Sequence, residues 1–406
     1  MSDVLRPATE WELQSMMGAL HERQISIEVV GAGSKRGAGR PATAAGVLTT
    51  AGLRGITLYE PTELVMSARA GTPVSQIEVE LASRSQMLPF EPVDPGPMLG
   101  GAPGVQTIGG VFATNFSGAR RISAGGARDH ILGIRAINGR AEAFKAGGRV
   151  MKNVTGYDIA RGLTGSWGTL AILTEATFKV LPLPDDVATL VYFGHTDEIA
   201  AELMCAAMGS PFEISGTAHL TEALAARIRN DEIVVERKSA TALRLENFTK
   251  SIHYRKERLK SALAAYGEPL ELDLESSLRL WGELRRLSVF PFGSHQIWRI
   301  SASPRMAPKL VAAIRRHMPV ETYYDWSGGL AWIETPATAD AGAADIRRAV
   351  ASFGGHATLV RADESVRRSV DVFQPMSPGV ERLTQGLKSA FDPLGILNPG
   401  RMYATL

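Results

Sequence analysis

The hydrophobic and polar positions of the first 180 residues alternate between helical and strand spacing. The apolar residues within 13–20 fall on one face of a helix, and Thr9 followed by Glu12 has the spacing of a capping box at its start. A β-rich run over 25–30 comes next and leads into a loop that is rich in glycine. The pattern predicts a helix, then a strand, then a glycine loop.

The α/β pattern continues beyond this loop. Thr72 and Pro73 have the sequence of a helix start, and the predicted helix runs to about 85, ahead of a proline-rich run over 89–97. The strands expected in the rest of this region cover 63–70, 131–137, 142–145 and 170–180.

Residues 183 to about 370 have a different sequence pattern. Glycine becomes less frequent, and strand-like runs alternate with amphipathic helical runs. This order predicts two ferredoxin-like units of antiparallel sheet with helices on one face. The expected strands are 190–193, 213–219, 233–236, 270–274, 296–301, 321–326, 330–334 and 357–360, and the expected helices are 198–208, 242–265, one from 275, 307–318 and 343–353.

Charge and cysteine content narrow the class of protein. The 406 residues carry 44 basic and 42 acidic side chains, so nothing in the bulk charge indicates a nucleic-acid partner or an anionic membrane. Cys205 is the only cysteine, which excludes a disulfide framework and an iron-sulfur cluster held by this chain alone. No apolar stretch is long enough to span a bilayer, and no signal peptide is recognisable. We expect a cytoplasmic protein, with room for peripheral attachment to a membrane through a partner.

Glycine is concentrated in particular segments, with sixteen glycines between Gly100 and Gly168. Such a density is expected where the backbone needs positive φ or approaches a ligand closely. The loop over 31–39 does not match the dinucleotide fingerprint, because Arg36 stands at the third glycine position and Pro41 follows where a helix should run. It can instead form an anion-binding nest with Lys35 nearby, or be an ordinary surface loop.

Three further segments share this character. Small residues and hydroxyl or amide donors fill 107–118, glycines recur over 162–168 before a strand, and Asn398-Pro399-Gly400 specifies a tight turn near the end of the chain. Each alone is explained by a turn. Together they indicate a large, flat, phosphate-bearing cofactor.

The four segments resemble the FAD-binding domain of the vanillyl-alcohol oxidase and p-cresol methylhydroxylase type. Within that family, KNVTGYDIARGLTGSWGTL, with Trp167 where relatives usually carry Glu, is most similar to the FAD-binding (E) subunits of glycolate oxidase. The resemblance implies an α+β fold, with a two-subdomain PCMH-type FAD domain over 1–182, an antiparallel-sheet, ferredoxin-like cap over 183–370 and a C-terminal segment over 371–406 that returns to the FAD domain.

The resemblance also implies which residues hold the flavin. The pyrophosphate loop has no histidine of the kind through which many relatives bind FAD covalently, so we predict non-covalent FAD. The implied FAD-binding residues are Gly31, Gly33, Ser34, Lys35, Arg36, Gly37, Thr107, Gly109, Gly110, Thr114, Asn115, Gly118, Gly165, Ser166, Gly168, Ile172, Asn398 and Arg401.

Catalytic residues are harder to assign. Arg285 in LWGELRRL resembles the family's Trp-x-x-Arg carboxylate clamp, with one residue more between Trp281 and the arginine. Tyr157 is a candidate acid or base above the flavin, and His295 is a candidate for the cap pocket together with Arg299. For Tyr157 and His295 a purely structural role is the alternative. The family's histidine motif is absent, since no two of the eight histidines have its spacing, so we expect no metal site.

The implied activity is oxidation of glycolate, a small 2-hydroxy acid, to glyoxylate. The missing histidine motif favours a chain that acts with a larger flavin subunit and an iron-sulfur subunit of the same complex. Two alternatives stay open: a self-sufficient FAD-dependent alcohol or hydroxy-acid oxidase, and a structural FAD-bound subunit without chemistry of its own. A cell-wall precursor reductase, which shares the flavin fold, is more distant.

Overall fold

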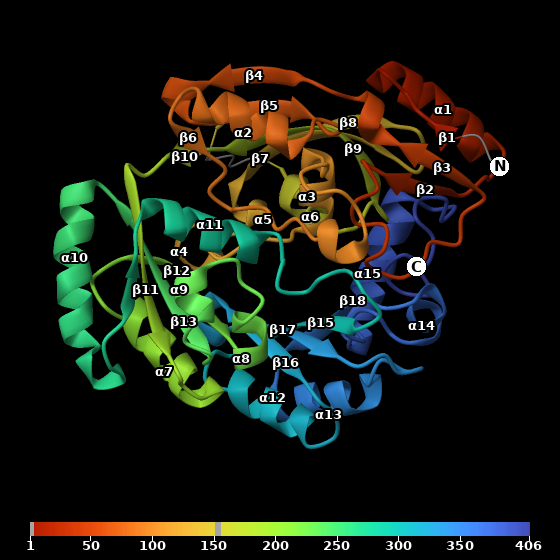
Figure 1. Cartoon of the computed structure of the whole chain (residues 1–406). Coiled ribbons are helices and arrows are strands. Elements are labelled where there is room, and N and C mark those ends of the chain that lie inside the picture. The colour runs from red at the N-terminus through yellow and green to blue at the C-terminus, as the bar shows by residue number, and fades with distance from the viewer. Residues whose placement is uncertain (1–3, 151–155) are drawn as a thin grey trace. The chain divides into compact units, whose positions relative to one another are not determined.

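The computed structural model describes residues 4–150 and 156–406, and the chain forms two compact units (Figure 1). The first comprises Met1–Ser117, Gly125–Leu183 and Pro375–Leu406, and the second comprises Gly118–Ala124 and Pro184–Gln374. The domain boundaries expected from the sequence, at 182/183 and 370/371, stay predictions.

The first unit begins with a small parallel sheet. Its strand order is β1 (Val4–Leu5), β3 (Gly46–Thr49), β2 (Ile27–Val30). Helix α1 (Glu10–Glu22) is capped as predicted, because the Thr9 side chain accepts the Glu12 N–H at 3.1 Å. The buried face of α1 packs with Ile27 and with Leu397, which comes from the far end of the chain.

A five-stranded antiparallel sheet forms the rest of the first unit's framework. Its strand order is β4 (Ile56–Glu60), β5 (Val65–Arg69), β9 (Ala171–Lys179), β7 (Ile131–Asn138), β8 (Ala143–Gly147). The remaining elements of the unit are β6 (Gln86–Met87), β10 (Leu181–Pro182), α2 (Val74–Ala82), α3 (Ile108–Thr114), α5 (Ala127–His130), α6 (Ile159–Leu163), α15 (Pro378–Phe391), and the short 3-10 turns η1 (Thr50–Gly52), η2 (Pro61–Glu63) and η3 (Pro97–Leu99).

The second unit is built on one eight-stranded antiparallel sheet. Its strand order is β14 (Leu270–Leu272), β11 (Asp186–Phe193), β13 (Ala240–Asn247), β12 (Ile214–Leu220), β16 (Glu321–Asp325), β17 (Leu330–Thr335), β15 (Gln296–Ser301), β18 (His356–Arg361). Its helices and 3-10 turns are α4 (Arg121–Ala124), α7 (Asp197–Met208), α8 (Glu222–Ala225), α9 (Asp231–Val234), α10 (Thr249–Ala262), η4 (Ala264–Tyr266), α11 (Leu274–Arg285), α12 (Ala307–Arg315), η5 (Trp326–Gly328), α13 (Ala343–Phe353) and α14 (Glu364–Ser369).

The sheet of the second unit consists of two halves with the same topology. Setting aside the short helices, each half follows the order strand, helix, strand, strand, helix, strand, and its first strand lies between its third and its fourth, as in ferredoxin-like folds. The predicted α+β class with ferredoxin-like units is therefore confirmed. The halves join where β12 pairs with β16, which makes the sheet continuous.

Two expected elements of this region are wrong. Residues 233–236 were expected to form a strand, but Asp231–Val234 form a short helix. The helix expected over 242–265 begins only at Thr249, because Ala240–Asn247 form strand β13 between β11 and β12. The residues of β13 suit a helix by local propensity, and pairing on both sides, with burial of most of the strand, overrides that preference.

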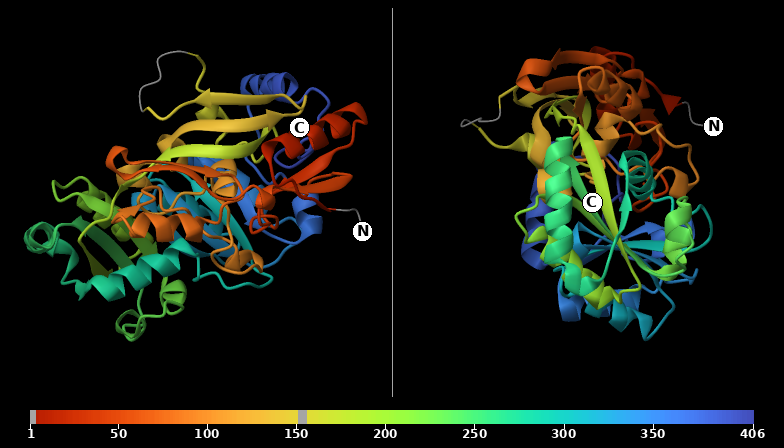
Figure 2. Two further views of the ribbon diagram at one scale, coloured as in Figure 1. Left: turned by 90° about the horizontal axis from the view of Figure 1, so that it is seen from above. Right: turned by 60° about the vertical axis from the view of Figure 1, so that its left-hand side comes forward.

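The two faces of this sheet differ. His219 and Tyr324 oppose each other across β12 and β16, and both contact Asp197 of α7, at 3.4 Å and 2.8 Å. Helix α7 therefore covers their face, and α10 lies along β11 and β13 (Figure 2). The residues next to His219 on β12 and next to Tyr324 on β16 point to the opposite face of the sheet, because successive side chains of a strand alternate between its faces.

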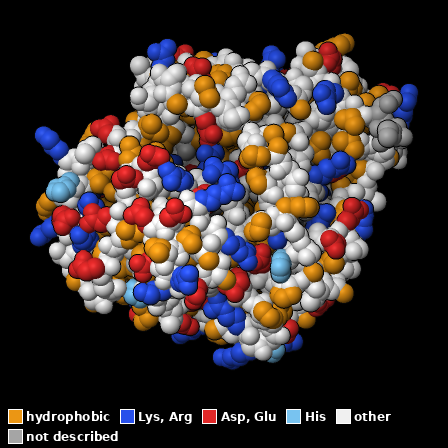
Figure 3. All heavy atoms as spheres, in the orientation of Figure 1, with side chains coloured by type: hydrophobic (Ala, Val, Ile, Leu, Met, Phe, Trp, Pro, Cys, Tyr) orange, Lys and Arg blue, Asp and Glu red, His pale blue; other side chains and the backbone are white. Residues whose placement is uncertain are grey.

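The charged surface and the lengths of the helices do not point to a particular partner. On the face drawn in Figure 3, basic and acidic side chains are interspersed. Across the described residues, the structure contains no helix with the length and apolar character needed to cross a membrane.

Candidate functional site

The four glycine-rich segments line one cavity of the first unit. The lining residues that the sequence predicts are Gly31, Gly33, Ser34, Lys35, Arg36, Thr107, Gly109, Gly110, Thr114, Ser166, Gly168, Ile172, Asn398 and Arg401. Four other predicted residues are not part of the lining: Gly37, Asn115, Gly165 and Gly118, the last of which belongs to the second unit.

The loop after β2 presents backbone donors to this cavity. Within the described chain, the N–H groups of residues 32–35 donate no hydrogen bond to another group. Gly33 has a φ of +78°, which permits the sharp bend that brings these groups together. Such a run of amides, beside the cation Lys35 and beside Arg36, whose guanidinium pairs with Glu28, is suited to an anion.

Lys35 is a buried cation in this loop. Its side chain is only 8% exposed, and its Nζ donates to Gln106 Oε1 at 2.8 Å. Burial lowers the pKa of Lys35 to about 8, against the opposing effect of the Asp94 charge. A nearby anion therefore changes the protonation of Lys35 in an accessible pH range.

We expect FAD affinity to fall as the pH rises through the pKa of Lys35, which is about 8. Below that pKa the ammonium attracts the pyrophosphate, and above it the neutral amine does not. The loss should approach about tenfold per pH unit above the pKa. FAD titrations followed by flavin fluorescence, from about pH 6.5 to about pH 9.5, measure it.

Two variants control this experiment. Lys35→Met should bind FAD weakly at every pH, with the pH dependence removed. Arg36→Met should keep the wild-type pH dependence, since its guanidinium does not titrate in this range. A wild-type affinity that is flat across the range would show that Lys35 does not neutralise the pyrophosphate.

The second segment forms helix α3, which packs tightly against β5. The Gly109 N–H donates to the Ala70 carbonyl oxygen at 2.8 Å, and a Cβ on Gly109 would lie 2.8 Å from that oxygen and 2.7 Å from the Ala70 Cβ. Only glycine fits at this contact. The Thr107 side chain caps α3 by accepting the Gly110 N–H at 3.3 Å.

The third segment places a tryptophan against the cavity in a rare backbone conformation. Trp167 has a φ of +55°, is 7% exposed, and its N–H donates to the Ala113 carbonyl oxygen at 2.9 Å. A bulky residue in the left-handed region is uncommon and is often functional. The sequence analysis noted that Trp167 departs from the family pattern but did not count it among the site residues. That departure was the signal that could have placed Trp167 at the cavity.

Most of the other lining residues were missed because their small or aliphatic side chains carry no chemical signal. Thr50 comes from η1 and Ala70 directly follows β5, and neither lies in a glycine-rich segment. The lining residues absent from the sequence prediction are Val29, Val30, Ala32, Thr50, Ala70, Ala113, Leu163, Trp167, Ala171 and Leu173.

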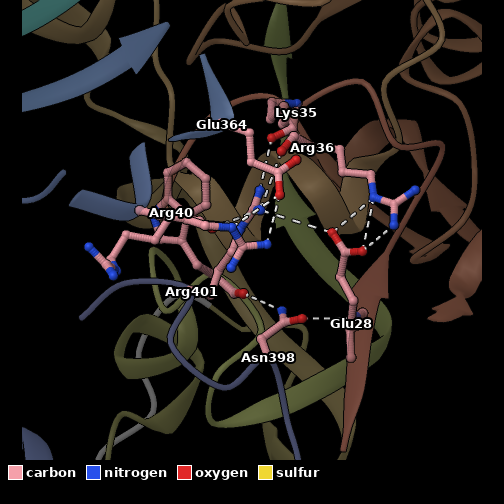
Figure 4. A network of polar contacts seen from close by, with 10 residues as sticks. Glu28, Lys35, Arg36, Arg40, Glu364, Asn398 and Arg401 are labelled. Carbon is pink, nitrogen blue, oxygen red and sulfur yellow. Dashed lines mark hydrogen bonds and ion pairs between the residues drawn. The ribbon is translucent and has the colours of Figure 1, made fainter. Parts of the chain in front are cut away.

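The C-terminal segment returns to this cavity and fixes the glycine loop (Figure 4). Asn398 accepts the Val29 N–H at 2.6 Å through Oδ1 and donates to the Trp167 carbonyl oxygen at 2.7 Å through Nδ2. Arg401 donates to the carbonyl oxygens of Lys35 and Arg40, at 3.0 Å and 3.1 Å. Three separate stretches of chain are thereby joined at the cavity.

The structure does not place the three catalytic candidates in this cavity. Tyr157 precedes α6 in the first unit, is 92% exposed, and lines a separate pocket with Asp158 and Arg161. Arg285 is the last residue of α11 and is partly buried, and His295 is exposed ahead of β15. Their catalytic roles stay predictions. Lys152, Asn153, Val154 and Thr155 of the third family motif lie outside the described residues.

Comparison with known proteins identifies the family. The family described as "FAD binding domain" matches residues 2–147. Glycolate oxidase subunit GlcE of Escherichia coli is 36% identical over 382 residues, which cover 94% of this chain and 93% of that protein. The chain belongs to this FAD-binding family. Glycolate oxidase subunit GlcD of Bacillus subtilis is 30% identical over 200 residues, which cover 49% of this chain and 41% of that protein.

Two solved structures share the fold of this chain. A structure of p-cresol methylhydroxylase superimposes with a TM-score of 0.73 at 14% identity, covering 98% of this chain and 88% of that one. Alkyldihydroxyacetonephosphate synthase superimposes with a TM-score of 0.70 at 15% identity, covering 98% of this chain and 76% of that one. The predicted PCMH-type FAD-binding fold is confirmed.

The residues around the cavity fit FAD, the cofactor of this family. The free amides of 32–35 and the two cations suit its pyrophosphate. The residues of α3 that line the cavity are small, which leaves room along that wall for a flat ring system. The chain therefore belongs to a family of FAD-dependent oxidoreductases.

Proposed function

We propose that this chain is the FAD-binding subunit of a glycolate oxidase or dehydrogenase complex that oxidises glycolate to glyoxylate. The observation that carries the proposal is the similarity to GlcE over nearly the full length of both chains, combined with the flavin cavity of the first unit. The similarity extends well beyond the FAD domain and includes the second unit. Similarity to GlcD is confined to about half the chain.

In this proposal the chain's own residues hold and orient the cofactor without a covalent bond. Bound FAD supplies the two-electron acceptor for oxidation of a hydroxy acid. Lys35 and Arg36 neutralise the pyrophosphate, and Trp167 and α3 shape the wall along the ring system. Asn398 and Arg401 keep the glycine loop in one conformation, which lowers the entropy that binding costs.

The partners in this proposal are a larger flavin subunit and an iron-sulfur subunit. GlcE of Escherichia coli and GlcD of Bacillus subtilis are each named as a subunit of glycolate oxidase. The sequence lacks the paired histidines with which relatives hold a metal, so a second flavin subunit that carries them would supply the remaining chemistry. Peripheral attachment to the inner face of a membrane would then take place through the complex.

Flavin reduction with and without partners tests this proposal. The purified chain should contain one dissociable FAD that acid precipitation releases from the polypeptide. Stopped-flow absorbance should show slow reduction of that flavin by glycolate alone, and fast reduction once the two partner subunits are added.

Each outcome separates the rival functions. Robust turnover by the isolated chain with an artificial acceptor would identify a self-sufficient oxidase. A flavin that glycolate never reduces, even within the assembled complex, would identify a structural subunit. Direct reduction of the flavin by NADPH would indicate a cell-wall precursor reductase.

A further inference from the structure

Helix α15 of the first unit, drawn in blue in Figure 1, presents an apolar face to solvent. Val380, Leu383 and Leu387 are 52%, 73% and 52% exposed, and their spacing places them on one side of the helix. A Cβ added to Gly379 or Gly386 of the same helix would meet open space. We call Val380, Leu383 and Leu387 the apolar stripe of α15.

The other side of α15 is the one that faces the protein. Among the residues of α15, all of which the structure describes, only Lys388 is buried. Its ammonium donates to Asp392 and to two backbone carbonyl oxygens of the first unit. Phe391, at the end of the helix, packs against Phe144 of β8 with the ring centres 5.9 Å apart. The orientation is unusual, because a surface helix ordinarily turns its apolar stripe towards the core.

The apolar stripe has the form of a docking element. Single exposed apolar side chains are common on proteins, whereas a contiguous apolar patch marks a contact surface. The stripe runs along a helix of 14 residues, which is about 21 Å long. Its spacing of i, i+3 and i+7 is that of the anchors with which an amphipathic helix binds in an apolar groove. The shape of the stripe therefore fits a groove on another protein surface.

The charges beside the stripe indicate which kind of surface covers it. Arg382 is exposed next to Leu383, and its side chain forms no hydrogen bond or ion pair with any other residue that the structure describes. Glu381, the acidic residue of α15, is half-buried and accepts a hydrogen bond from Gln385 at 3.3 Å. A symmetric contact between two copies of α15 would bring two arginines together without an exposed carboxylate for either. A different protein with a carboxylate opposite Arg382 complements this charge.

We propose that the apolar stripe of α15 docks another subunit of the complex, in an apolar groove that carries a carboxylate opposite Arg382. This inference rests on the proposed function and adds the surface through which this chain meets its partner. Lys388, on the other side of the same helix, holds the C-terminal segment that fixes the glycine loop. The docked subunit would therefore contact the helix that anchors this segment.

Biolayer interferometry between the full-length, FAD-loaded chain and the two other subunits, purified together without it, tests this surface. Leu383→Gln and Leu387→Gln should each weaken binding about tenfold or more, the loss expected for a central anchor of an interface. Arg382→Glu should slow association and remove its slowing by salt, because a charge at the rim of an interface acts mainly on the association rate. Since both leucines are exposed, FAD content and thermal unfolding of their variants should match the wild type.

Two variants away from α15 are the matched controls. Val79 of α2 is 73% exposed, as Leu383 is, so Val79→Gln should bind the two subunits as the wild type does. Arg316, which follows α12, is an exposed arginine of the second unit, and Arg316→Glu should leave the association rate and its salt dependence unchanged. Sedimentation velocity of the isolated wild-type chain should show a monomer.

If the wild-type chain binds the two subunits and a variant with both leucines replaced binds them equally well, this inference fails and the proposed function stands. A dimer of the isolated chain that the same double variant dissociates would also overturn it, because the stripe would then belong to a second copy. Wild-type association and salt dependence in Arg382→Glu would refute the carboxylate. A wild-type chain that does not bind the two subunits contradicts the proposed function itself, and this inference falls with it.

Discussion

Replacing Lys388 by methionine is expected to lower the free energy of unfolding by about 3–5 kcal/mol, the range measured when one partner of a buried ion pair is removed. Lys388 Nζ donates to Asp392 Oδ2 at 2.7 Å and to the carbonyl oxygens of Thr169 and Leu397, at 2.8 Å and 2.9 Å. Asp392 is 1% exposed, so the variant would leave a buried carboxylate without its counter-charge. Urea unfolding of the purified chain measures the change.

Arg382→Met provides the matched control. Arg382 lies on the same helix, α15, and is exposed, so its loss should change the free energy of unfolding by at most about 0.5 kcal/mol. FAD affinity should fall in Lys388→Met alone, because Lys388 holds Leu397, the neighbour of Asn398. Equal stability of the two variants would mean that the Lys388 to Asp392 pair is not a structural link.

The sequence located the cofactor segments because glycine has a backbone signature that needs no knowledge of contacts. Gly33 with positive φ and Gly109 against Ala70 are cases where only glycine satisfies the geometry. The strand expected at 296–301 and the helix expected at 343–353 match β15 and α13, because their hydrophobic periods are regular. The local sequence pattern was sufficient to predict the cofactor segments, this strand and this helix.

Features that depend on long-range pairing were not predictable in the same way. Strand β13 has residues with good helix propensity and exists because β11 and β12 pair on both sides of it. Lys388 resembles any lysine of an amphipathic helix until Thr169 and Asp392 are seen around its ammonium group. Arg121 and Arg299 are 178 positions apart, and only the fold brings both to Trp326.

Replacing Asn398 by alanine is expected to cost about 2–4 kcal/mol of stability and to weaken FAD binding at least about tenfold. The variant loses both side-chain hydrogen bonds, so the Val29 N–H and the Trp167 carbonyl oxygen each lose the amide as a partner. Those two groups belong to the strand before the glycine loop and to the third segment. FAD affinity should therefore fall even where the chain remains folded, since the cavity wall is no longer fixed.

Asn398→Gly separates the backbone contribution from the hydrogen bonds. Asn398 has a φ of 46°, which costs alanine more than glycine, so the glycine variant should be more stable than the alanine variant by about 1 kcal/mol. Both variants lack the amide and should lose FAD affinity equally. Thermal unfolding with and without FAD, together with flavin titrations, measures both quantities. Recovery of wild-type FAD affinity in Asn398→Gly would show that backbone conformation, and not the amide, holds the C-terminal segment against the flavin cavity.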